Sequence, residues 1–60
     1  MPVITLEAAQ LSREQKQQST KEFTESAARI MDLPASAVYV FLKENHADNA
    51  GVGGKLLSDK

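Results

Sequence analysis

The stretch VYVFLK, residues 38–43, has the strongest strand character in the chain and decides how the rest must fold. β-branched and aromatic residues dominate it, as is typical of a β-strand. Side chains along a strand point to alternate faces, so one face carries Val38, Val40 and Leu42 and the other carries Tyr39, Phe41 and Lys43. Both faces hold apolar groups. We therefore expect both to be covered, one of them by another subunit.

Upstream of this strand, the sequence predicts a helix that begins after Ser12. The residues SREQ at positions 12–15 match a capping box, in which the serine hydroxyl and the glutamine side chain each satisfy a free amide of the first turn. Pro34 disfavours helical geometry at the preceding residue, so the helix should end at about residue 31 or 32. The inner face is expected to carry an apolar stripe at helical spacing, formed by Phe23, Ala27, Ile30 and Met31 and extended by Thr20 and the stem of Lys16.

Two further segments complete the predicted architecture. VITLEA, residues 3–8, reads as a β-branched strand, so the order is strand, helix, strand. A helical crossover implies that the two strands pair in parallel with right-handed connectivity. The glycines and asparagines after residue 44 predict turns and a short C-terminal hairpin. We expect an α/β (α+β) fold, with one β-α-β domain over residues 1–60 that oligomerises through its sheet.

Length and composition limit the possible functions. A chain of 60 residues buries too little surface to be very stable alone, and this one has no cysteine and a single histidine, His46. Disulfides and thiolate or His-rich metal sites are therefore excluded, no cofactor is predicted, and oligomerisation remains as the stabilising device. The net charge of −1, with both signs interspersed, argues against a nucleic-acid partner. There is no apolar run of membrane-spanning length and no secretion signal, so we expect a cytoplasmic protein with no membrane partner.

Pro2, directly behind the initiator Met1, is the candidate for catalysis. Removal of Met1 would leave a secondary amine on a rigid ring, and such an amine can act as a general base if its pKa lies near neutrality. An apolar pocket or nearby cations would favour the unprotonated form. The alternative is that Pro2 has no chemical role, which holds for most prolines at this position.

The ordered motifs of the chain resemble the 4-oxalocrotonate tautomerase family. They are MP before a strand, SREQK at the helix start, LPASAVYV into the second strand, KEN after it, and NAGVGG near the C-terminus. The resemblance implies dimers that share a four-stranded sheet bearing two helices, and hexamers made of three dimers. It also implies that Pro2 moves a proton between carbons of a small unsaturated 2-oxo acid, the reaction of a tautomerase.

The chain departs from the best-known members at the substrate site. Leu11 and Tyr39 stand where those members have arginines, and Ala50 stands where they have an aromatic residue. The substrate-binding candidates are therefore Tyr39 as a hydrogen-bond donor, Lys43 as a cation and Arg13 reaching in from a neighbouring chain, with Leu11, Ala50 and Val52 lining the pocket.

These substitutions leave other functions open. The alternative functions are that of a proline-dependent hydratase, dehalogenase or decarboxylase, and that of a non-catalytic oligomeric binding module. For Tyr39 and Lys43, the competing interpretation is an interfacial tyrosine and a solvated lysine at the end of a strand.

Overall fold

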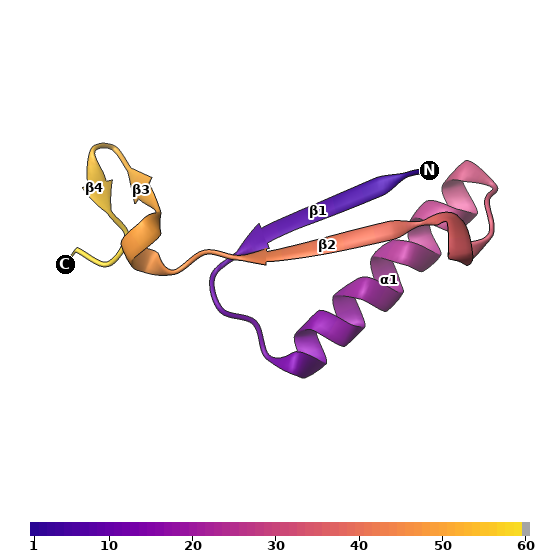
Figure 1. Ribbon diagram of the computed structural model, residues 1–60, viewed down its shortest axis with the longest axis horizontal. Helices are drawn as coiled ribbons and strands as arrows, with labels where there is room; N and C mark the ends of the chain where they lie inside the picture. Colours follow the sequence, from indigo (N-terminus) through magenta and orange to yellow (C-terminus); the bar gives the residue numbers. More distant parts are fainter. Residues whose placement is uncertain (60) are drawn as a thin grey trace.

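The structure, a computed structural model, describes residues 1–59. Its body consists of strand β1 (Val3–Ala8), helix α1 (Arg13–Met31), the short 3-10 helix η1 (Ala35–Ala37) and strand β2 (Tyr39–Glu44). β1 and β2 pair in parallel, from Val3 opposite Tyr39 to Ala8 opposite Glu44 (Figure 1). The predicted β-α-β unit is thus confirmed. β2 begins one residue later than predicted, because the amide of Val38 instead donates to the carbonyl of Ala35 and closes η1.

Both ends of α1 are fixed by local hydrogen bonds. At the start, the Ser12 hydroxyl accepts from the Gln15 amide at 3.1 Å, and the Ser12 amide donates to Gln15 Oε1 at 2.9 Å, so the capping box is present as predicted. At the end, Asp32 adopts a left-handed conformation with φ of 56°, and Leu33 donates to the carbonyl of Ala28. This Schellman-like closure, followed by Pro34, stops the helix at the predicted position.

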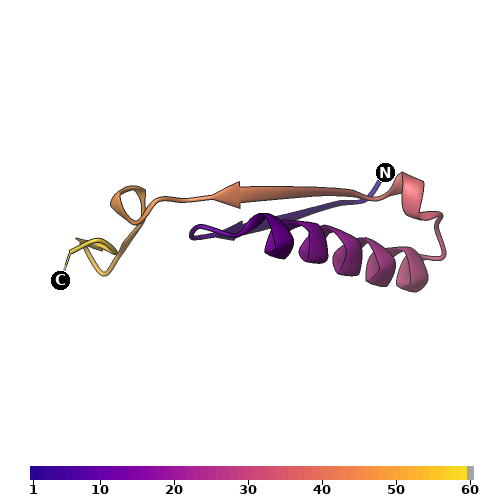
Figure 2. The same cartoon turned by 90° about the horizontal axis from the view of Figure 1, so that it is seen from below.

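The helix covers only one face of the two-stranded sheet (Figure 2). The sheet residues on the covered side are half-buried, namely Ile4, Leu6, Ala8, Val40 and Leu42. The stripe predicted on the helix is only partly correct. Lys16 and Ala27 are half-buried, but Ile30 and Met31 remain 73% and 52% exposed because the chain leaves most of the last helical turn uncovered. Thr20 is also exposed, and Phe23 is 36% exposed.

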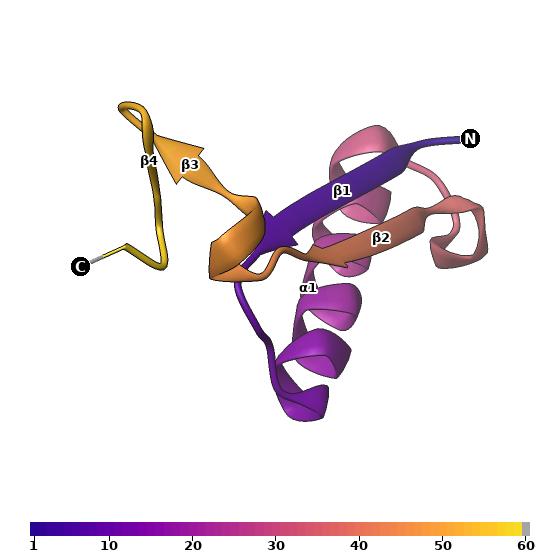
Figure 3. The same cartoon turned by 60° about the vertical axis from the view of Figure 1, so that its left-hand side comes forward.

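The C-terminal segment forms a small arm. The 3-10 helix η2 (Ala47–Asn49) leads into an antiparallel hairpin of β3 (Gly51–Val52) and β4 (Lys55–Leu56), so the predicted hairpin is confirmed. Gly53 and Gly54 both have positive φ, which suits the tight turn of a two-residue hairpin loop. Figures 1 and 3 show the arm projecting beyond the end of β2, away from the body. The Cα radius of gyration is accordingly 14.7 Å, against about 10 Å for a compact chain of this length.

A single chain has no core of its own. None of residues 1–59 is fully buried. On the sheet face opposite the helix, Val3, Tyr39 and Phe41 are each about half exposed, at 50%, 47% and 51%. We call this surface the open sheet face. Within the same residues, no helix is long and apolar enough to cross a membrane.

Candidate functional site

Pro2 lies at the start of β1 and is held against the start of β2. Its carbonyl accepts a hydrogen bond from the Tyr39 amide at 3.0 Å, and the residue is half-buried. The side chains of Tyr39 and Val3 lie opposite each other in the parallel ladder and therefore on the same face. The structure thus joins the backbones of two predicted site residues, Pro2 and Tyr39, while the Tyr39 side chain lies on the face that carries Val3.

The remaining candidates lie at the other end of the strands. Lys43 shares the open sheet face with Tyr39 but is four residues further along β2, roughly 13 Å at the rise of a β-strand. Leu11 is half-buried in the connector between β1 and α1, a segment that we define as residues 9–12. Arg13 is the exposed first residue of α1. These residues cannot contact a small molecule bound at Pro2 of the same chain.

The two hairpin candidates lie further still from Pro2. Ala50 is half-buried directly before β3, and Val52 is 70% exposed within that strand. The arm that carries them extends away from the body, at the end opposite Pro2 (Figure 1). Both residues therefore lie far from Pro2 of their own chain (Figure 1).

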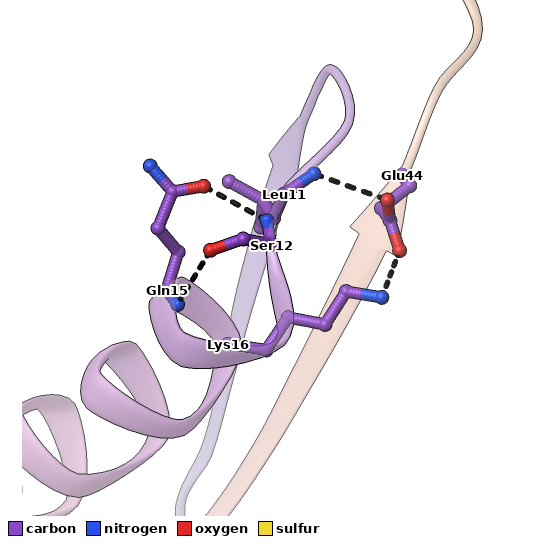
Figure 4. Close-up of polar contacts among 5 residues, drawn as sticks. All are labelled: Leu11, Ser12, Gln15, Lys16 and Glu44. Carbon is purple, nitrogen blue, oxygen red and sulfur yellow. Dashed lines mark hydrogen bonds and ion pairs between the residues drawn. The ribbon is translucent and has the colours of Figure 1, made fainter.

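Glu44, which sequence reasoning did not single out, organises the end that carries Leu11. Its carboxylate accepts a hydrogen bond from the Leu11 amide at 3.1 Å and forms an ion pair with Lys16 (Figure 4). The Lys16 ammonium, and next the Leu11 amide, hold the pKa of the Glu44 carboxyl below its usual value of 4.5, against a smaller opposing effect of desolvation. We call this arrangement the Glu44 clasp. It ties the connector to the end of β2.

Asn45 adds two contacts beside the clasp. Its amide donates to the Ala8 carbonyl at 2.7 Å, and its side chain donates to Glu7 Oε1 at 3.2 Å. The connector and the segment after β2 are therefore joined on both sides of Glu44. Between them lies an open recess of about 320 Å³, lined by Ala9, Gln10, Asn45, His46 and Ala47.

A second hollow lies on the helix. It measures about 360 Å³ and is lined by Arg13, Lys16, Gln17, Thr20 and Lys21. It is more open than the recess and lies entirely on α1. No group of three or more His, Cys, Asp or Glu side chains that could hold a metal ion occurs within residues 1–59.

The chain matches known proteins over nearly its whole length. The family model described as tautomerase enzyme matches residues 2–60. A probable tautomerase of Halalkalibacterium halodurans is 33% identical over 61 residues, covering all of both chains.

Solved structures give the same result. The crystal structure of a 4-oxalocrotonate tautomerase homologue is 33% identical with a TM-score of 0.93, covering 100% of this chain and 97% of that one. DmpI from Archaeoglobus fulgidus is 34% identical with a TM-score of 0.87, covering 97% of this chain and 100% of its own.

Proposed function

The chain belongs to the tautomerase family, and on that premise we propose that it is an isomerase whose base is the amine of Pro2. The proposed reaction is keto–enol proton transfer on a small unsaturated 2-oxo acid. The observation that supports the proposal is the position of Pro2. It directly precedes β1, its carbonyl accepts a hydrogen bond from the Tyr39 amide, and it lies at the edge of a half-exposed apolar sheet face.

The chemistry follows from the free amine. Met1 is 83% exposed and therefore accessible to an aminopeptidase, whose action leaves the Pro2 nitrogen as a secondary amine. This nitrogen takes a proton from the enol hydroxyl or from a carbon beside the carbonyl, and then returns it to another carbon of the conjugated system. Negative charge develops on the 2-oxo oxygen meanwhile, and a hydrogen-bond donor such as the Tyr39 hydroxyl stabilises it.

The amine must be unprotonated at working pH. An ordinary α-amino group has a pKa of about 8. Burial in apolar surroundings lowers that value, because it disfavours the charged form. Val3, Tyr39 and Phe41 provide such surroundings once a second surface covers the open sheet face.

A second chain also completes the site. Two copies that extend one sheet about a two-fold axis perpendicular to it run antiparallel and carry both helices on the same face. Each main strand spans six residues, or about 20 Å, so Pro2 and the connector lie at opposite ends of one chain. In the antiparallel dimer, the Pro2 end of one copy therefore lies beside the connector end of its partner. Leu11, Arg13 and Lys43 are thereby supplied in trans to Pro2.

The open sheet face and the arm remain uncovered in such a dimer. Both carry exposed apolar residues, including Phe41, Val52 and Leu57. We therefore place three dimers in a hexamer, in which these surfaces contact neighbouring dimers. This assembly accounts for the lack of a core in the single chain.

Replacing Pro2 tests the proposal. Pro2→Ala should lower tautomerisation of phenylenolpyruvate by several orders of magnitude, measured by the loss of enol absorbance. Pro34→Ala is the matched control, since it removes the other proline of the chain and leaves the N-terminal amine unchanged. Intact-mass measurement should show that wild-type protein lacks Met1. Equal turnover by wild type and Pro2→Ala would reject the assignment.

A second chemistry at the same amine is the alternative. Leu11 and Ala50 offer neither a cation nor an aromatic surface, so a substrate with a second carboxylate finds no counter-charge in them. Hydration, dehalogenation and decarboxylation of a 2-oxo or unsaturated acid remain compatible with an activated Pro2. A panel of such acids separates these reactions from isomerisation. A protein with Met1 retained and no turnover would instead be a binding module.

A further inference from the structure

The recess beside the connector has the properties of a small neutral binding site. Its volume of about 320 Å³ lies at the lower end of the range for small-molecule pockets. None of its five lining residues is an acid, a lysine or an arginine. Ala9 and Ala47 contribute only methyl groups, so the polar groups of Gln10, Asn45 and His46 determine what the recess can recognise.

Two of these polar groups are available to a ligand. His46 Nδ1 accepts a hydrogen bond from the Asp48 amide at 3.1 Å and lies 3.6 Å from Asp48 Oδ2, so Nε2 carries a proton and is a donor. The Gln10 side-chain amide takes part in none of the hydrogen bonds among residues 1–59, whereas that of Asn45 is used by Glu7. The recess therefore offers a donor from His46 and a donor and an acceptor from Gln10.

The charges beside the recess are mainly carboxylates. Asp48 Oδ2 lies 3.6 Å from His46 Nδ1, and Glu7 accepts a hydrogen bond from the Asn45 side chain. Lys16 is paired with Glu44 in the clasp and is not among the lining residues of the recess. A ligand carboxylate would therefore meet no lysine or arginine among the lining residues, and it would approach the carboxylates of Glu7 and Asp48. A neutral oxygen, such as a hydroxyl or a carbonyl, can bond to Gln10 and His46 without that repulsion.

We propose that this recess is a substrate subsite, which binds a neutral, oxygen-bearing tail of the 2-oxo acid through Gln10 and His46. The proposal rests on the function proposed above, because the antiparallel dimer places this recess beside the partner's Pro2. The 2-oxo acid group reacts at Pro2 of one copy, and the tail enters the recess of the other.

The walls of the recess are held before any ligand arrives. The Glu44 clasp fixes the connector at Leu11, and Asn45 fixes the adjoining segment to Ala8 and Glu7. The binding groups therefore need little reorganisation, which favours selective recognition.

The experiment compares two enol substrates, phenylenolpyruvate and its 4-hydroxyphenyl analogue. Wild type should prefer the hydroxylated tail. Gln10→Ala and His46→Asn should each reduce that preference by about three- to tenfold, the usual effect of one neutral hydrogen bond. The loss of preference should appear as a higher KM for the hydroxylated substrate, with kcat within about twofold of the wild-type value. The asparagine in His46→Asn retains an acceptor for the Asp48 amide, so it preserves the local turn. Gln17→Ala on the exposed surface of α1 is the matched control.

The outcomes separate the subsite from the reaction. The subsite is overturned if wild type shows no preference, or if both variants keep it. If Pro2→Ala turns over the substrate normally, the proposed role of Pro2 is refuted. The subsite is then tested by a binding measurement alone. For that case 4-hydroxyphenylpyruvate is titrated into the Pro2→Ala protein and followed by NMR. Shifts of both the Gln10 side-chain amide and the His46 ring support the subsite, provided that the His46 shift is lost in Gln10→Ala and the Gln10 shift is lost in His46→Asn. Unmoved signals overturn it.

Discussion

Replacing Phe41 should disrupt the assembly, because this side chain provides much of the apolar surface of the open sheet face. A phenylalanine exposes about 200 Å² when unfolded, and Phe41 keeps 51% of its surface exposed in the single chain. About 100 Å² per copy is therefore available for burial against another chain. At about 25 cal/mol per Å², its loss in Phe41→Ala costs about 2.5 kcal/mol per copy. In a dimeric contact that uses both copies this is about 5 kcal/mol, or more than a thousandfold in the association constant.

Sedimentation velocity over a concentration series measures this effect directly. Wild type should remain assembled at concentrations where Phe41→Ala dissociates, and the variant should also unfold at a lower temperature because the separate chain lacks a core. Gln17→Ala, on the exposed surface of the helix, should behave as wild type. If Phe41→Ala assembles as tightly as wild type, the open sheet face is not an interface, and the account of how the chain acquires its core is wrong.

Two further predictions concern the helix and the clasp. Ser12→Ala removes the N-cap and should cost about 1 kcal/mol in unfolding free energy, measured by chemical denaturation, while Ser26→Ala in the middle of α1 should cost nothing. The ionised Glu44 carboxylate contributes stability above its unfolded pKa, and this contribution is lost as the pH falls through the lowered folded-state pKa, below 4.5. Glu44→Gln should therefore lower the thermal midpoint at neutral pH, whereas the gap to wild type should close on acidification. Added salt should shrink the gap by screening Lys16, and a constant gap from neutral pH to pH 3 would contradict the role of the clasp.

Local signals made the secondary structure predictable from sequence. The β-branched runs, the capping box at Ser12 and the proline after the helix each act within a few residues, and each element appears in the structure within one residue of the predicted position. The helix stripe was less well predicted, because periodicity identifies an apolar face but not how far along the helix the sheet extends. Ile30 and Met31 belong to that face, yet the chain leaves them exposed.

The candidate site was less accessible to sequence reasoning. Pro2 and Tyr39 were identified separately, and the parallel register brings them together. Lys43 was placed correctly, on the face of Tyr39 and at the end of the strand, and the register shows how far this end lies from Pro2. The Glu44 clasp was missed because Leu11 and Glu44 are separated by 33 residues, and no spacing rule links such a pair.

The absence of any fully buried side chain within residues 1–59 makes the proposed assembly depend on the concentration of the protein. A chain that acquires a buried interior only by association folds and associates in one step. The stability of such a protein depends on its concentration. We expect the specific activity of the proposed isomerase to fall on dilution for this reason. In a cell, a modest drop in expression should remove the assembled protein more than proportionately, because separate chains are open to proteases.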